Sequence, residues 1–254
     1  MKNIVWNLAH LFDDDEDPRI EKKRNFVEQK SYAFINTWKG RTDYLRDPAL
    51  LKKALDEYEE WKRSYGSEGD EGYYFWLRTS QNQNDPVLKA KFNLIEQFSK
   101  KIQNDIQFFY LRIAKIPARL QKKFIQYPGL KEYRHYLERL FAESKYLLSE
   151  PEEKIMNLKS PSSYANWVKM TSSFLAKEER SVISENRKRG MKPFSEIASL
   201  MNSRQKKVRD SAAKAFNDIL KKHVDVAEAE INSVFANKKV DDELRGLSRP
   251  ELAR

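Results

Sequence analysis

The stretch DPVLKAKFNLIEQFSKKIQNDIQFFYLRIAKIP, residues 85–117, contains the longest helical pattern in the chain. Asp85 and Pro86 predict its start, because Asp caps free N–H groups and Pro fits the first helical turn. Pro117 is expected to kink or end it. At 1.5 Å per residue a helix over 86–116 would be roughly 45 Å long, which favours an antiparallel neighbour of similar length. Its apolar residues recur at spacings of three, four or seven: Leu88, Phe92, Ile95, Ile102, Ile106, Phe109 and Ile113.

Toward the N-terminus, two further Asp-Pro pairs predict helix starts, at residues 17–18 and 47–48. The second opens an amphipathic helix that ends near Tyr65, with Gly66 as a left-handed cap. The following GSEGDEG, residues 66–72, is expected to form a flexible acidic loop. Periodicity does not decide the state of the short apolar run YYFWL, residues 73–77.

Toward the C-terminus the pattern stays helical. Residues 181–192 are basic and irregular, and they suggest a small hairpin. The last long helix is expected to run from a Ser203 cap to Phe235. The other helix starts are marked by prolines or by capping serines: Pro128, Ser149 with Glu152, Ser160-Pro161 and Ser195.

These patterns predict an all-α protein of long antiparallel helices in a helical cap or bundle. We expect two subdomains, residues 1–125 around the long helix 86–116, and residues 126–254. A chain of 254 residues is long enough to bury a sizeable core. The absence of cysteine excludes disulfides and thiolate metal sites and favours a reducing, cytoplasmic compartment. No run approaches the roughly 18 apolar residues of a membrane span, so no membrane partner is expected.

The net charge of +10 is concentrated in residues 86–139, which carry 12 Lys or Arg against 4 Asp or Glu. Such cations near tyrosines could bind RNA or acidic peptides through charge and stacking. A solvated basic helix face is the simpler interpretation, and no RNA-binding signature is present, so nucleic acid is disfavoured. The residues concerned are Lys100, Lys101, Arg112, Lys115, Arg119, Lys122, Lys123, Lys131, Arg134 and Arg139, with Tyr110, Tyr127, Tyr133 and Tyr136.

The sequence offers no catalytic or metal-binding residue. The three histidines, His10, His135 and His223, lie on separate segments, and none has a second His at the spacing of four that a helical zinc site uses. His135 with Glu138 is best explained as a surface pair. There is no nucleophile elbow and no phosphate-binding loop.

Two acidic groups also have structural explanations. Neighbours on a helix point about 100° apart, so Glu152 and Glu153 are better explained by the helix dipole than as an acid–base pair. The run from Asp13 to Asp17 precedes a helix start and is expected to be solvated.

Four segments resemble the N-terminal half of the oligoendopeptidase F family, zinc peptidases related to thimet oligopeptidase. The third is the most specific, since a Pro-x-Leu, a Tyr-rich helix and a Leu-Ser-x-x-Glu-Glu helix start follow in the family's order. Where the family usually has a His before that Leu-Ser pair, this chain has Tyr146 nearby. The segments are WNLAHLF (6–12), SYAFINTWKGRTDY (31–44), PGLKEYRHYLERLFAESKYLLSEPEEKIM (128–156) and NSRQKKVRDSAAKAF (202–216).

The resemblance implies a non-catalytic role. In that family a His-Glu-x-x-His helix and a further Glu in the C-terminal half bind zinc and hydrolyse short unfolded peptides. None of these positions exists here, so the 254 residues should be inactive alone, with zinc expected only in the absent half. The resemblance implies a helical cap that forms one wall of the substrate channel, with substrate-binding residues unassigned.

Two interpretations remain open. The chain is either the N-terminal part of a longer peptidase, or a stand-alone helical protein that binds peptides or RNA and lacks the catalytic half. The first predicts an exposed apolar surface for the missing C-terminal domain, or a second copy of the chain covering it. The ending VDDELRGLSRPELAR, residues 240–254, favours the first. Gly246 ends one helix there, and Ser248 and Pro250 begin another that has no body, as expected of an interrupted chain.

Overall fold

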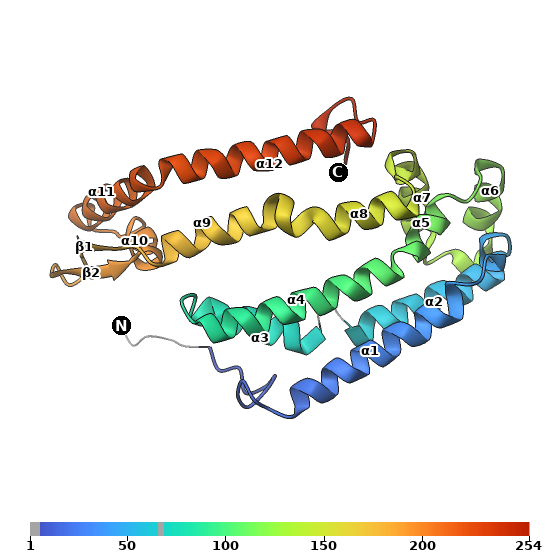
Figure 1. Ribbon diagram of the computed structural model, residues 1–254, viewed down its shortest axis with the longest axis horizontal. Coiled ribbons are helices and arrows are strands. Elements are labelled where there is room, and N and C mark those ends of the chain that lie inside the picture. Colours follow the sequence, from blue (N-terminus) through green and yellow to red (C-terminus); the bar gives the residue numbers. More distant parts are fainter. Residues whose placement is uncertain (1–5, 66–68, 254) are drawn as a thin grey trace. The chain divides into compact units, whose positions relative to one another are not determined.

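The computed structural model describes residues 6–65 and 69–253. Nearly all of its secondary structure is helical, with a single antiparallel hairpin in the described part, which confirms the all-α prediction (Figure 1). The chain forms two compact units: unit 1 is Met1–Leu158 with Glu243–Arg254, and unit 2 is Lys159–Asp242. The predicted subdomain boundary at residues 125 and 126 falls inside unit 1.

Unit 1 contains the first seven α-helices, and capping residues explain where they begin. Asp85 accepts hydrogen bonds from the N–H groups of Val87 (2.8 Å) and Leu88 (3.2 Å), and Asp17 and Asp47 cap in the same way. The three predicted Asp-Pro starts are therefore confirmed. The helices are α1 (Arg19–Trp38), α2 (Pro48–Tyr65), α3 (Gly69–Gln81), α4 (Pro86–Ile106), α5 (Phe108–Ala114), α6 (Ala118–Gln126) and α7 (Arg134–Glu143).

Three predictions about unit 1 were wrong in detail. The long helix is interrupted at Gln107, between α4 and α5, where the Gln107 side chain is buried and accepts a hydrogen bond from Asn157 (2.6 Å). Residues 69–72 are not a loop, because α3 begins at Gly69. The acidic side chains of its first turn interact favourably with the positive end of the helix dipole. The predicted Gly66 cap lies outside the described residues. The segment at Pro128 is only a 3₁₀ turn, Pro128–Leu130, ahead of α7.

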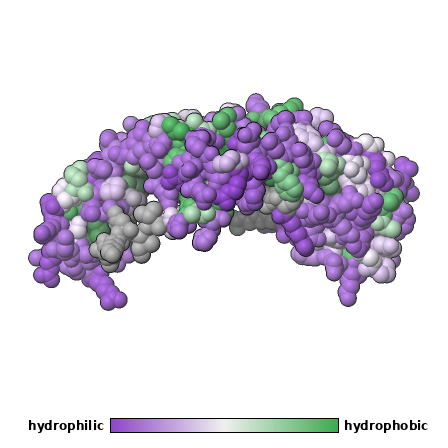
Figure 2. Space-filling view, turned by 90° about the horizontal axis from the view of Figure 1, so that it is seen from below, coloured by the Kyte–Doolittle hydropathy of each residue, from purple (hydrophilic) through white to green (hydrophobic). Residues whose placement is uncertain are grey.

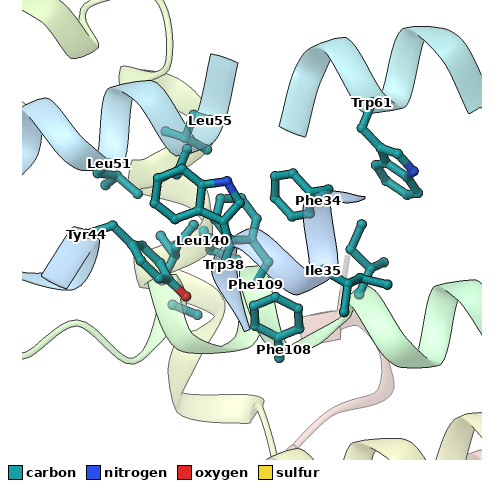
Figure 3. Packing of buried hydrophobic residues seen from close by; sticks show 14 of the residues in the cluster. Phe34, Ile35, Trp38, Tyr44, Leu51, Leu55, Trp61, Phe108, Phe109 and Leu140 are labelled. Carbon is teal, nitrogen blue, oxygen red and sulfur yellow. The ribbon is translucent and has the colours of Figure 1, made fainter. Parts of the chain in front are cut away.

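The core of unit 1 is aromatic (Figure 3). Phe34 of α1 meets Phe109 of α5 edge to face, with ring centroids 5.1 Å apart. Trp38 is fully buried against Tyr44 (5.5 Å) and donates its indole N–H to Glu57 (2.7 Å). Edge-to-face pairs contribute stabilising energy beyond that from the apolar area these side chains bury. This cluster therefore anchors α1, α2 and α5 to one another.

Helix α8 (Glu150–Ser160) begins in unit 1 and continues into unit 2 through a π-helical turn, Pro161–Ala165. We predicted a fresh helix start at Ser160-Pro161, which was wrong. Pro161 has no N–H to donate to the preceding turn, and a wider turn lets the helix continue past it. The remaining elements are α9 (Asn166–Ala176), β1 (Glu179–Ile183), β2 (Arg189–Pro193), α10 (Phe194–Leu200), α11 (Lys206–Lys222), α12 (Val224–Leu244) and a 3₁₀ turn, Pro250–Ala253.

Unit 2 has a small core under its hairpin. Strands β1 and β2 pair antiparallel, with Glu179 opposite Pro193 and Ile183 opposite Arg189, which confirms the predicted hairpin. The predicted single helix from Ser203 to Phe235 was wrong, because His223 separates α11 from α12. Among the described residues no helix is long and apolar enough to cross a membrane. The buried cluster is formed by Val182, Ile197, Ala212, Ala215 and Ile219.

Candidate functional site

The start of α8 carries the most specific motif of the sequence. The Glu152 carboxylate accepts hydrogen bonds from the Ser149 N–H (2.8 Å) and from its hydroxyl (2.5 Å). These bonds satisfy a donor at the helix start and lower the pKa of Glu152. The bond from the Ser149 N–H to Glu152 confirms that half of the predicted capping box, whereas the Ser149 hydroxyl donates to the Glu152 carboxylate and does not accept from its N–H.

Glu153 is buried and clamps two segments that are distant in sequence. Its carboxylate accepts a hydrogen bond from the Leu148 N–H (3.0 Å) and two from Arg245 (2.5 and 2.9 Å). Arg245 also donates to the carbonyl of Tyr146 (3.1 Å). Burial opposes ionisation, but the bonds from Arg245 and Leu148 lower the pKa of Glu153. The carboxylate is therefore an anchor for the segment after α12, and not a general base.

The basic segment is largely used within unit 1. Arg112 donates to the carbonyl of Lys39 (2.6 Å), Lys115 to that of Leu148 (2.6 Å) and Lys123 to that of Arg46 (3.0 Å). These cations join loops and helix ends, so they are not available as a continuous stripe for a polyanion. Among the described residues, five of the candidates have side chains that form no ion pair, hydrogen bond or cation–π contact, unlike the other five: Lys100, Arg119, Lys122, Lys131 and Arg134.

The tyrosines of that segment also have internal partners. Tyr133 donates its hydroxyl toward Asp56 (2.8 Å) and Glu59 (2.9 Å), and burial together with these carboxylates raises its pKa. Tyr110 and Tyr127 are half-buried against the aromatic core. Tyr136 is the one of the four that is classed as exposed, so the structure does not assemble a stacking platform from them.

The three histidines are in different surroundings. His10 and His135 are exposed. His223 lies 2.8 Å from the buried Glu178 carboxylate and stacks on Phe174, with ring centroids 5.9 Å apart. Across the described residues there is no group of three His, Cys, Asp or Glu that could hold a metal ion.

Glu178 binds more cations than any sequence pattern indicated. Lys222 and Arg180 donate hydrogen bonds to its carboxylate, and His223 also contacts this carboxylate. Hydrogen bonding by Lys222 above all lowers the pKa of Glu178 to about 2, against the effect of burial and with help from His223 and Arg180. The cluster holds the start of β1 against the junction of α11 and α12.

The acidic run from Asp13 to Asp17 is solvated only in part, because Asp13, Asp14 and Glu16 are exposed, as predicted, whereas Asp15 and Asp17 are not. Asp17 is buried and accepts hydrogen bonds from the Asp13 N–H (2.9 Å) and from Arg19. Asp15 binds Arg78 (2.7 Å) and the hydroxyl of Tyr74 (2.9 Å). Hydrogen bonding to Arg78 and to Arg19 lowers the pKa values of Asp15 and Asp17, respectively. Asp15 therefore attaches the N-terminal segment to α3, and Asp17 joins this segment to the start of α1.

The sequence motifs did not indicate which apolar side chains are exposed. No residue of α12 is buried among those described, and Phe235 is 68% exposed. Val224, Ile231 and Phe235 are spaced by seven and four residues and share one helix face. In unit 1, Ile155 and Leu158 of α8 are exposed in the same way. The face that Figure 2 shows is mostly hydrophilic, with small groups of hydrophobic residues.

Comparison with known proteins points to one family. The family model described as oligopeptidase F matches residues 112–186, which include the α8 motif. An oligoendopeptidase F homolog from Borreliella burgdorferi is 25% identical over 155 residues, which cover 61% of this chain and 25% of that protein.

Two solved structures share the fold. Oligoendopeptidase-F from Enterococcus faecium superposes with a TM-score of 0.72 at 14% identity, over 91% of this chain and 44% of that one. A putative peptidase from Chlamydophila abortus gives a TM-score of 0.57 at 14% identity, over 97% of this chain and 40% of that one. The chain thus spans less than half the length of these relatives. The resemblance to the N-terminal region of the oligoendopeptidase F family is confirmed.

Proposed function

We propose that this chain, which matches the N-terminal region of the oligoendopeptidase F family, is the non-catalytic helical part of a zinc metallopeptidase that hydrolyses short peptides. In this role it forms one wall of the substrate channel. The observation that carries the proposal is the family match over residues 112–186, centred on the α8 motif. The names of these relatives describe peptidases, which supports peptides as the substrate class.

The exposed face of α12 supports a missing protein partner. None of the 21 residues of α12 is fully buried, so this helix gains less from tertiary packing than a core helix does, and such packing normally provides most of a helix's stability in proteins. Val224, Ile231 and Phe235 on one face give a partner domain an apolar surface to cover. In the proposal that partner is the C-terminal catalytic domain.

The metal chemistry belongs to that domain and not to this chain. The donor groups of the described residues do not converge on any metal site, and the one histidine with a carboxylate neighbour is occupied by an internal ion-pair cluster. In the proposal this chain contributes binding and positioning. Glu153 and Arg245 fix the segment that leads out of α12.

The test begins with the gene downstream of the codon for Arg254. A reading frame that continues into His-Glu-x-x-His supports the proposal. The longer product and residues 1–254 alone are then compared on quenched fluorescent peptides with added zinc. We expect zinc-dependent cleavage by the longer product only. Cleavage by residues 1–254 alone, or a longer product that lacks any peptidase activity, contradicts the proposal.

A further inference from the structure

An open pocket of about 640 Å³ lies in unit 2, between the β1–β2 hairpin and α11. It belongs to neither the α8 motif nor the Glu178 carboxylate. Its volume is in the range of small-molecule sites, roughly 300–1,000 Å³. Ile183 and Ala215 provide an apolar part of the lining, and the rest is polar: Arg180, Ser181, Arg189, Lys207, Asp210, Ser211, Lys214 and Asp218.

The pocket carries positive charge that the protein does not neutralise. Of its two carboxylates, Asp218 is bound by Arg180 (2.6 Å) and Asp210 by Lys206 (2.5 Å), a residue outside the pocket. Lys207 and Lys214 form no ion pair or hydrogen bond among the described residues. The lining has four cations, Arg180, Arg189, Lys207 and Lys214, against these two carboxylates, and this excess raises the positive potential of the pocket and attracts anions.

The spacing of the free lysines selects the kind of anion. Lys207 and Lys214 are seven residues apart on α11, so they lie on one face and roughly 10 Å apart along the axis. On the hairpin side Arg189 donates to the Ser181 carbonyl (3.1 Å), which holds its guanidinium beside the pocket. A single carboxylate would reach one lysine only. A ligand with several linked anionic groups would reach both.

We propose that this pocket binds a small molecule that carries two or more linked phosphate groups. Lysine ammonium groups bind phosphate oxygens as point charges, and an arginine adds directed donors. Arg180 is already paired with Asp218 (2.6 Å) and with Glu178 (2.7 Å), so the cations left for the ligand are Lys207, Lys214 and Arg189. The proposal does not depend on the proposed peptidase role.

The probe is tripolyphosphate, titrated into residues 1–254 by calorimetry at low and at physiological salt. We expect saturable 1:1 binding, and at least tenfold weaker binding by the double variant Lys207→Gln/Lys214→Gln. The matched control is Lys177→Gln/Lys221→Gln, which removes two exposed lysines of unit 2 outside the pocket. Orthophosphate, which has one phosphate group, should bind at least tenfold more weakly than tripolyphosphate.

Three results would overturn the proposal: no saturable binding at millimolar tripolyphosphate, equal weakening in the control variant, or equal affinity for orthophosphate. The second result would indicate general attraction to a basic surface. Circular dichroism and the unfolding midpoint of each variant without ligand establish that it is folded. Both lysines are exposed, so the exchange to Gln should shift the midpoint little.

Discussion

The two units bury apolar surface in very different ways. Among the described residues, the main cluster of unit 1 holds 20 buried side chains and includes Trp38, Phe108 and Phe109. The cluster of unit 2 holds five, and the largest of them is an isoleucine. Unit 2 also contains most of α12, in which no described residue is fully buried and many are half-buried. Unit 1 therefore has a large apolar core, whereas unit 2 combines a small core with a polar clamp around Glu178.

The largest effect on stability is expected from Trp38→Ala in unit 1. Trp38 is 0% exposed, and large-to-small changes of buried aromatics cost about 3 to 5 kcal/mol. We expect a loss of that size in the free energy of unfolding, measured by urea titration with circular dichroism. Trp76→Ala, at a residue that is half exposed, is the matched control and should cost less than about 1 kcal/mol. Equal costs would show that unit 1 lacks a dominant core.

The next effect concerns the clamp between α8 and the segment after α12. Arg245→Met leaves the buried Glu153 without its cation, and we expect a loss of about 2 to 3 kcal/mol, below the figure for fully buried pairs because Arg245 is partly exposed. Arg249→Met removes an exposed pair with Glu251 and should cost less than about 1 kcal/mol. A double-mutant cycle with Glu153→Gln isolates the coupling. If Arg245→Met costs no more than Arg249→Met, the clamp does not stabilise the fold.

The pH dependence of unit 2 tests its polar clamp. The folded-state pKa of Glu178 is lowered to about 2 from 4.5, so its contribution is present above pH 4.5 and is lost as the pH falls toward 2. The difference in unfolding midpoint between the wild type and Glu178→Gln should therefore be constant above pH 5 and should shrink as the pH falls below 5. Glu196→Gln, in an exposed pair with Lys192, should leave the midpoint nearly unchanged. A difference that persists at pH 2 would contradict the assignment.

The smallest expected effect is on α12. Phe235→Ser should change the unfolding free energy of residues 1–254 by less than about 0.5 kcal/mol, because the side chain is already exposed. In the longer peptidase the same change should lower stability by several times that amount, since the proposed catalytic domain covers this face. Ile219→Ser, at a fully buried residue of α11, should destabilise both forms. Equal effects of Phe235→Ser in both would mean that the face stays open.

Local patterns predicted what local chemistry decides. The Asp-Pro starts, the bond from the Ser149 N–H to Glu152 and the hairpin depend on neighbours in sequence, and all were confirmed. The breaks at Gln107 and His223 were missed because apolar periodicity continues across both. Each break coincides with a distant polar partner, Asn157 for Gln107 and Glu178 for His223.

The candidate site was harder to predict for the same reason. Asp15 binds Arg78, which lies 63 positions along the chain, and Glu153 binds Arg245, 92 positions away. A charge run shows its sign but not its partners, so Asp13–Asp17 resembled a solvated stretch. The basic segment looked available for a ligand, although Arg112 and Lys115 donate to backbone carbonyls of the protein. A sequence does not indicate which cations will make such bonds.

The Glu178 clamp has a consequence for how much the sequence between its ends can vary. His223 meets Glu178 across 45 positions, so the clamp closes a loop that contains the hairpin, α10 and α11. The entropy lost on closing a loop grows only with the logarithm of its length, and a doubling costs about 0.6 kcal/mol. Insertions at the exposed hairpin turn, residues 185–188, therefore cost little while the two ends stay joined. Relatives of this chain are expected to differ in length there before they differ at Glu178.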